Sequence, residues 1–402
     1  MKKLTSTPLK DAIELSLGLA DIKPSAEWIC ISEALGRVLA EEIKCQKNLP
    51  SFNNSALDGY ALRHSDSGKK LYIKDTVFAG QNKDDVLEEN ECFKIMTGAK
   101  IPKSADTIVA FEDAQALADN YVLMPSNIKK GNAFRVKGEE LAKGETLFSQ
   151  GTLINSAVLA MLASQGISQI KVYKKITIGV FSTGDELKEP WESARDDEIY
   201  NVNSSSLIAL FSEHGFVADY CGVIPDSLME SKKYFAKMKR YDVLVTTGGI
   251  SMGEADFVEE ALLSNGLKPL FHGINIKPGR PTMIGKMDST IVASMPGNPL
   301  AAYVNAFLIL TPLLKKLQGQ RDFQHKILKA KMAKELKVKP NRTNLVLGTY
   351  KEGSFFVTGE NKYGSGMIMP MIQSNSLLVL DENTDILKEG DEINLIVFKG
   401  TF

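Results

Sequence analysis

The feature that most constrains the fold is a regular alternation of apolar strands and helices between residues 176 and 317. Runs typical of buried strands occupy 176–181, 217–223, 243–246, 282–284 and 290–293, and helical patterns occupy 204–214, 227–239, 257–263 and 299–317. This alternation predicts a doubly wound α/β domain with a largely parallel sheet. Ligands of such sheets bind in the loops beyond the carboxyl ends of the strands, so these loops are where a site is expected.

Three further regions complete a multidomain fold of the α/β plus β class, around an α/β domain spanning 175–320. Helical spacing at 9–20, 31–43 and 155–163 predicts a helical region made of residues 1–45 and 146–174, in which all three helices are expected to pack together. Short β-like runs separated by Gly, Pro, Asn and Asp predict a β-rich insert domain over 46–145 and a small C-terminal β-domain over 325–402.

Composition excludes several classes of protein. The 402 residues contain 48 Lys and Arg against 49 Asp and Glu, so no overall basic excess favours nucleic acid or an anionic membrane as a partner. Four dispersed cysteines and four histidines, without C-x-x-C or i,i+4 histidine pairs, disfavour a zinc site or a disulfide framework. Because no apolar run approaches the ~18 residues of a membrane span and no secretory signal is present, we expect a cytoplasmic protein.

The first loop at the expected ligand edge is acidic. Ser182, Thr183 and Gly184 follow an apolar strand, and Asp185 and Glu186 come directly after them. Carboxylates that project from such a turn are suited to a cation. A strand-to-loop turn with solvated acids is the alternative interpretation.

The second loop is rich in glycine. Three glycines let the backbone approach a phosphate, consecutive N–H groups form an anion nest, and the aspartate at the end of the loop caps the next helix or holds a divalent cation. A plain glycine-rich turn with an N-cap is the alternative. The residues concerned are Thr247, Gly248, Gly249, Ser251, Gly253 and Asp256.

Two more loops complete the expected edge. Lys277 and Arg280 lie three residues apart in a frame of proline and glycine, which holds two cations in a stiff turn suited to a polyanion. The fourth loop precedes the longest apolar helix and offers its N–H groups to an anion, through Pro296, Gly297, Asn298 and Pro299. Backbone donors, cations and carboxylates together predict a phosphorylated ligand with a divalent metal.

These motifs, in this order, resemble the molybdopterin molybdenumtransferases of the MoeA type, which include the E domain of gephyrin. The stretches that carry the resemblance are residues 34–40, 55–61, 96–99, 105–109, 182–187, 246–256, 277–281 and 296–299. The resemblance implies an elongated homodimer that uses the helical region for dimerisation. Its active cleft would lie between the α/β domain of one subunit and the β-rich insert of the other.

The resemblance also implies a reaction. Adenylylated molybdopterin and molybdate give the molybdenum cofactor and AMP with a divalent cation, usually Mg2+, and a molybdopterin adenylyltransferase is a candidate delivery partner. A non-catalytic pterin-binding or scaffold protein and a molybdopterin adenylyltransferase remain as alternatives.

The positions of this sequence that match the family's functional polar positions are Asp58, Thr97, Glu186, Asp226 and Asp256. Gly98 accompanies Thr97, and Pro296 and Pro299 match the molybdate region. We hypothesise that Asp226 and Asp256, with Glu186, hold the cation. Asp58 and Glu186 would position substrate, and Lys277 with Arg280 would attract molybdate or phosphate. The sequence departs from the family pattern at Gly273 and Arg280, where lysines are usual, so altered oxyanion contacts are expected.

Overall fold

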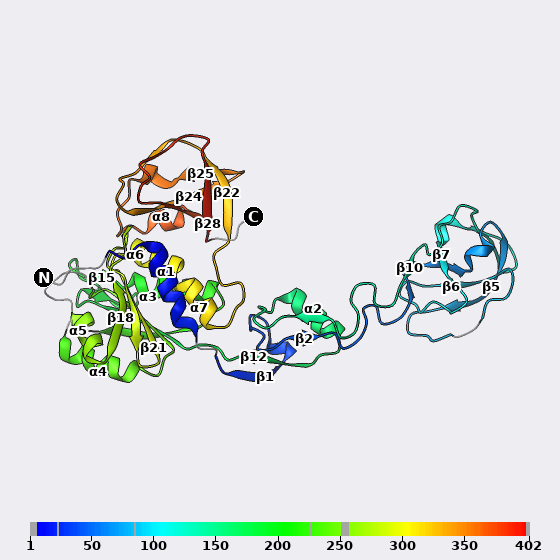
Figure 1. Ribbon diagram of the computed structural model, residues 1–402, viewed down its shortest axis with the longest axis horizontal. Coiled ribbons are helices and arrows are strands. Elements are labelled where there is room, and N and C mark those ends of the chain that lie inside the picture. The colour runs from blue at the N-terminus through cyan, green and yellow to red at the C-terminus, as the bar shows by residue number, and fades with distance from the viewer. Residues whose placement is uncertain (1–5, 22–23, 84–85, 225–226, 251–256, 399–402) are drawn as a thin grey trace.

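The computed structural model describes residues 6–21, 24–83, 86–224, 227–250 and 257–398. The molecule is elongated (Figure 1). The α/β domain and the C-terminal β-domain lie together at one end, a narrow central region follows, and the β-rich insert lies at the far end. The predicted multidomain α/β plus β class is therefore confirmed.

The α/β domain contains a six-stranded sheet in the order β16-β13-β17-β21-β20-β18. The first four strands are parallel to one another, and β20 and β18 join by antiparallel pairing. The sheet is thus parallel through most of its width and mixed at one edge. The bounds are β13 Ile178–Thr183, β16 Ala218–Ile224, β17 Val243–Thr247, β18 Leu267–His272, β20 Met283–Met287 and β21 Thr290–Met295.

Helices cover both faces of this sheet. Alternate residues of one strand enter different cores: Val243 and Val245 pack with one cluster, and Leu244 with the other. The first cluster includes α3 (Val202–Glu213) and the second includes α4 (Leu228–Met238) and α5 (Phe257–Ser264).

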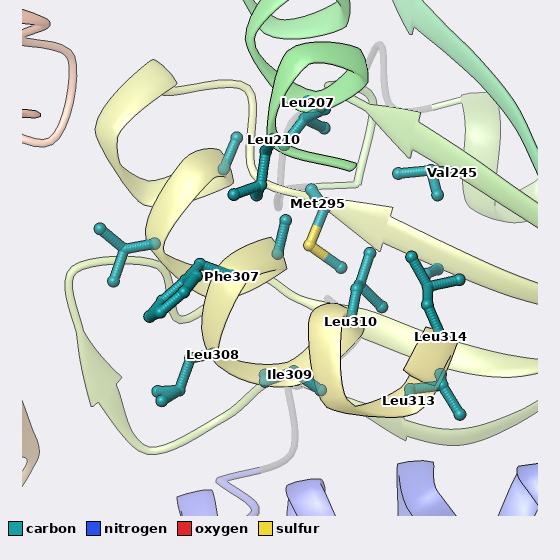
Figure 2. Close-up of a cluster of buried hydrophobic side chains, with 14 of the residues drawn as sticks. Leu207, Leu210, Val245, Met295, Phe307, Leu308, Ile309, Leu310, Leu313 and Leu314 are labelled. Atoms are coloured by element: carbon teal, nitrogen blue, oxygen red, sulfur yellow. The ribbon is translucent and has the colours of Figure 1, made fainter. Parts of the chain in front are cut away.

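A long apolar helix supplies much of the first core. It runs as α6 (Pro299–Asn305), a π-helical segment (Ala306–Leu310) and α7 (Thr311–Leu317). Its side chains pack with Met295, Val245 and α3 (Figure 2). Among the described residues this is the one helix long and apolar enough to cross a membrane by length and composition, and 78% of its apolar window is buried inside the molecule.

The predicted helical region differs from expectation in two ways. Helix α1 (Leu9–Gly18) packs on the α/β domain through Leu9 and Ala12, so it does not join the helix near residue 155. Residues 31–43 form no α-helix: a short 3-10 turn (Ile31–Glu33) is followed by a turn at 35–36, bridge residues at 38–39 and a bend at 40–41. The apolar spacing there reflects the burial of the Leu39 side chain against α2. The Leu39 backbone pairs with Val172 instead of continuing a helix.

The remaining elements of the central region are one helix and short strand pairs. In α2 (Ser156–Ser164), the Asn155 side chain accepts a hydrogen bond from the Val158 N–H at 2.9 Å and so caps the helix, and Gly166 follows its end with a φ of 73°. The strand pairs are β1 (Ala26–Cys30) with β12 (Gln169–Tyr173) and β2 (Ile43–Lys44) with β11 (Thr146–Phe148).

The insert is built on a sheet in the order β7-β4-β6-β5-β9-β8, with one apolar cluster on each face. No α-helix occurs in the described part of this domain. Its strands are β3 Asn54–Ser55, β4 Gly59–Leu62, β5 Lys70–Val77, β6 Glu91–Ile95, β7 Thr107–Ala110, β8 Gln115–Ala116, β9 Tyr121–Leu123 and β10 Phe134–Arg135.

The C-terminal domain is a small sheet that closes on itself, because β24 pairs with both β25 and β26. Its edge strand β19 (Ile276–Lys277) comes from the α/β domain and pairs in parallel with β24, with Lys277 opposite Asn344. The other elements are β22 Ile327–Met332, β23 Leu336–Lys337, β24 Thr343–Lys351, β25 Ser354–Val357, α8 Met369–Ile372, β26 Ser376–Leu380, β27 Ile386–Leu387 and β28 Glu392–Val397.

Candidate functional site

A cavity of about 1170 Å³ lies between the α/β domain and the C-terminal domain. The loops after β13, β17 and β21 line it, as the fold rule for ligand sites requires. The chain around Lys277 and two stretches of the C-terminal domain form its other walls. The four loops predicted from the sequence therefore do converge.

The acidic loop contributes three of its five predicted residues. Thr183, Gly184 and Glu186 line the cavity, and the exposed Glu186 folds its carboxylate back over Gly184, 2.6 Å from where a Cβ would stand. Among the described lining residues Glu186 is the one acid. Asp185 is exposed and is not part of the lining.

Ser182 is buried beneath the cavity rather than in its wall. Its hydroxyl lies 2.9 Å from Asn201 Oδ1, 2.9 Å from Ser204 Oγ and 2.8 Å from Thr247 Oγ1. This network joins β13, β17 and the start of α3, so Ser182 shapes the floor of the site without reaching a ligand there.

The glycine-rich loop requires its first two glycines. Gly248 and Gly249 have φ values of 85° and 64°, and both line the cavity with Thr247. A Cβ on Gly248 would stand 2.8 Å from the Thr183 carbonyl oxygen, and one on Gly249 would collide with Val258. Ser251, Gly253, Asp226 and Asp256 lie outside the described residues.

Only one of the two predicted cations reaches the cavity. Lys277 is exposed and lines it, together with Pro278, Gly279 and Pro281, whereas Arg280 does not. The chain turns at Gly279 with a φ of 98°, and the Arg280 carbonyl accepts hydrogen bonds from the N–H groups of Ile274 and Thr282. The structure therefore places Lys277, and not Arg280, in the cavity wall.

The fourth loop lines the cavity with all of its predicted residues, Pro296, Gly297, Asn298 and Pro299. The helix that follows is nevertheless capped by the C-terminal domain. The Leu300 N–H donates to the Ser365 carbonyl at 3.0 Å, and Asn298 Nδ2 donates to Ser365 Oγ at 2.8 Å. Part of the expected anion site is thus occupied by protein.

Several lining residues were missed by sequence reasoning. They are polar or aromatic groups that flank the predicted loops or belong to the C-terminal domain: Asn201, Asn203, Asn344, Tyr363 and Ser365. Asn203 holds the fourth loop by donating from Nδ2 to the Gly297 carbonyl at 2.7 Å. The signal that could have revealed part of this set is the glycine-bearing run at residues 363–366.

The insert carries a separate, preorganised carboxylate. Asp58 Oδ1 accepts hydrogen bonds from the Thr97 backbone N–H at 2.6 Å and the Thr97 hydroxyl at 2.7 Å. These two bonds lower the pKa of Asp58, the backbone bond most. Gly98 follows with a φ of 75° in open space. The chain does not bring this pair to the cavity, since the insert lies at the opposite end of the molecule (Figure 1).

The described residues do not by themselves complete a metal site, since no group of three or more His, Cys, Asp or Glu side chains among them is placed to share an ion. The Glu186 carboxylate is nonetheless a suitable donor for Mg2+, which is commonly held by one or two carboxylates together with substrate phosphates.

The fold and site define a class: a multidomain α/β protein with a cavity at the carboxyl edge of its parallel strands. The comparisons give the family. Residues 7–166 match the MoeA N-terminal region (domain I and II), 179–316 a probable molybdopterin binding domain, and 329–398 the MoeA C-terminal region (domain IV). The chain belongs to the MoeA family.

Full-length relatives agree with this assignment. A molybdopterin molybdenumtransferase of Haemophilus influenzae is 33% identical over 380 residues, covering 92% of this chain and 94% of that protein. One from Staphylococcus epidermidis is 29% identical over 379 residues, covering 92% and 90%. The crystal structure of the molybdopterin biosynthesis moeA protein of Pyrococcus horikoshii matches with a TM-score of 0.84 at 27% identity, covering 98% of this chain and 100% of that one.

Proposed function

We propose that this protein is a molybdopterin molybdenumtransferase, which inserts molybdenum from molybdate into adenylylated molybdopterin and releases AMP. The observation that carries the proposal is the cavity itself. Its described wall combines a glycine-rich backbone, one lysine and one carboxylate, on a chain that matches that family over residues 7–166, 179–316 and 329–398. These groups suit a ligand that carries phosphates and a reaction that consumes an oxyanion.

The cavity suggests a division of roles. Lys277 is an exposed cation in the wall and would attract molybdate or phosphate. Gly248 and Gly249 let the backbone approach a pyrophosphate without side chains between them. Glu186, with Asp226 and Asp256, would hold Mg2+, which neutralises phosphate charge when bound.

A homodimer would complete the site. Asp58 and Thr97 match functional positions of the family but are far from the cavity of their own chain, so the cavity would receive them from the insert of a second copy. The central region offers apolar side chains for such contact: Trp28, Leu35 and Leu153 are 62%, 67% and 46% exposed. The four cysteines are free thiols, which suits a reducing cytoplasm, where we place the enzyme.

The proposal is tested by incubating the protein with adenylylated molybdopterin, Mg2+ and molybdate. AMP release that depends on molybdate supports insertion. ATP consumption with unmodified molybdopterin would instead indicate an adenylyltransferase, and binding of pterin without turnover would indicate a scaffold. Omitting Mg2+ or replacing it with Ca2+ tests the cation.

Two substitutions sharpen this test. Glu186→Ala and Asp256→Ala should abolish AMP release without unfolding the protein. The Glu186 side chain is exposed, and the one hydrogen bond of this residue among the described residues joins its backbone carbonyl to the Ile199 N–H, which alanine retains, so loss of the carboxylate should not disturb the fold. Glu192→Gln is the control and should remain active, because it changes an exposed acid outside the cavity lining, in the connection between β14 (Leu187–Lys188) and β15 (Ile199–Tyr200). Full activity in both alanine variants would defeat the assignment.

A further inference from the structure

An asparagine in the core holds the loop that carries Lys277. Asn305, at the end of α6, is fully buried. Its Nδ2 donates to the Gly279 carbonyl at 2.8 Å and to Thr282 Oγ1 at 2.7 Å. The Thr282 hydroxyl in turn donates to the same Gly279 carbonyl at 2.9 Å. Two buried side chains therefore converge on one carbonyl oxygen of the cationic loop.

This contact leaves no room for a side chain at Gly279. The Asn305 amide lies against Gly279 so closely that a Cβ there would collide with it. Gly279 also has a φ of 98°, which an L side chain rarely adopts. The turn between Lys277 and Arg280 is therefore shaped by the buried amide beneath it.

Stability alone does not account for an amide at this position. Asn305 Oδ1 is buried and has no hydrogen-bond partner among the described residues, which is unfavourable in a core. The helix also changes to π geometry directly after Asn305, at Ala306–Leu310. Single π turns inside α-helices occur frequently at functional sites.

The other end of the loop is anchored in a different domain. Lys277 belongs to β19, which pairs with β24 of the C-terminal sheet opposite Asn344. The loop is thus held at Lys277 by one domain and at Gly279 by the other. Because both anchors lie within three residues, a shift at either one displaces the lysine.

We propose that Asn305 is a positioning residue, which fixes the cationic loop so that Lys277 meets the oxyanion substrate. This inference rests on the proposed function. Asn305 acts through the loop backbone and does not touch the substrate. Its removal should weaken oxyanion binding and leave binding of the pterin largely unchanged.

The experiment compares matched variants of the full chain. Asn305→Asp and Asn305→Leu keep the approximate size of the side chain and remove the Nδ2 donor. Thr282→Val removes the second arm of the clamp, whereas Thr282→Ser retains its hydroxyl. Thr311→Val is the control, since Thr311 is buried in the same helix and its hydroxyl has no partner among the described residues. Calorimetry with molybdate alone, steady-state kinetics and amide hydrogen exchange of residues 274–282 are the measurements.

We expect the Asn305 variants and Thr282→Val to weaken molybdate binding and raise the KM for molybdate by about tenfold, the equivalent of one lost hydrogen bond. The KM for adenylylated molybdopterin should change by less than about twofold, and exchange in 274–282 should accelerate. Thr282→Ser and Thr311→Val should resemble the wild type.

Unchanged molybdate affinity and unchanged loop exchange in folded Asn305 variants would overturn the inference. If those variants fail to fold, the Thr282→Val and Thr282→Ser pair decides it by the same measurements. A wild-type protein that neither binds molybdate nor releases AMP would overturn the proposed function, and with it the oxyanion role. Accelerated loop exchange in such a protein would still identify Asn305 as the loop anchor, so the two failures are distinguishable.

Discussion

Asn298 donates a hydrogen bond from Nδ2 to Oγ of Ser365, 2.8 Å away, and thereby joins the α/β domain to the C-terminal domain at the cavity wall. The Ser365 carbonyl accepts a second bond from the Leu300 N–H at 3.0 Å. The C-terminal domain is consequently part of the site. It covers a helix start that the sequence predicts to be open to an anion.

Ser365→Ala should impair substrate binding more than stability. The substitution removes the acceptor for Asn298 Nδ2 and leaves the backbone bond to Leu300 in place. We expect the KM for adenylylated molybdopterin to rise by about tenfold or less, with a nearly unchanged melting temperature. Thr349→Val is the control, because it removes a hydroxyl bond to the Gln373 carbonyl in the same domain, outside the cavity lining. Equal KM values in all three proteins would contradict the prediction.

Thr97→Val should raise the pKa of Asp58 part of the way to its ordinary value. The backbone N–H of Thr97 would still favour the charged carboxylate, but the hydroxyl bond would be lost. Carboxyl ¹³C NMR titration measures the shift directly, and the acid limb of the activity profile should move to higher pH. Thr97→Ser retains the hydroxyl and should titrate like the wild type. If Asp58 in Thr97→Val titrates like Asp58 in the wild type, the Thr97 hydroxyl has no effect on its pKa.

Gly248→Ala should abolish most activity because two penalties act together. The new Cβ would meet the Thr183 carbonyl at 2.8 Å, and the backbone would keep a φ of 85°. Displacement of the loop by a fraction of an ångström should lower kcat/KM by at least about tenfold. Gly353→Ala separates the two effects, since Gly353 has a φ of 81° in open space. It should cost about 1 kcal/mol of stability and leave kcat/KM unchanged.

Two histidines should make stability depend on pH. Burial lowers the pKa of both His214 and His325 to about 4, with a further contribution from Lys315. Unfolded histidine titrates near 6.5, so between about 6.5 and 4 the unfolded chain binds protons that the folded chain does not. The free energy of unfolding should therefore fall on acidification through this window and be fully retained above it.

Urea unfolding at pH 7.0 and pH 5.0 measures this loss of stability. His214→Gln with His325→Gln removes both titrating groups, and the double variant should lose less free energy of unfolding between the two pH values than the wild type does. An identical loss in both proteins would assign the pH dependence to other groups.

The sequence predicts the α/β domain well because its signals are local. Buried strands such as Val243–Thr247 are short and apolar, and most of the parallel strands are followed by a helix, so period and length suffice. The cap at Asn155 is equally local. The edge of a doubly wound sheet then identifies the loops that carry Glu186, Gly248 and Pro296, and all three residues reach the cavity.

The remaining features depend on contacts between distant segments. Residues 31–43 have helical apolar spacing, but Val38 and Leu39 pair with Leu153 and Val172, so tertiary pairing overrides the local pattern. Lys277 lines the cavity and Arg280 does not, and the Arg280 carbonyl accepts hydrogen bonds from the N–H groups of Ile274 and Thr282. No periodicity in the sequence could reveal either arrangement.

The contribution of Ser365 is likewise set by domain packing rather than by its neighbours in the sequence. Its carbonyl and hydroxyl meet Leu300 and Asn298, which belong to a different domain. Asp58 and Thr97 lie 39 residues apart in the sequence, and they form a hydrogen-bonded pair that the family motifs identify but that no local pattern does.

The two short strands β2 and β11 pair side by side where the chain leaves the central region for the insert and returns from it, with Lys44 opposite Thr146. The two points at which the chain enters and leaves the insert of about a hundred residues are thus adjacent. A domain attached in this way can be gained, exchanged or lost during evolution by joining two neighbouring chain ends, without refolding the cores on either side.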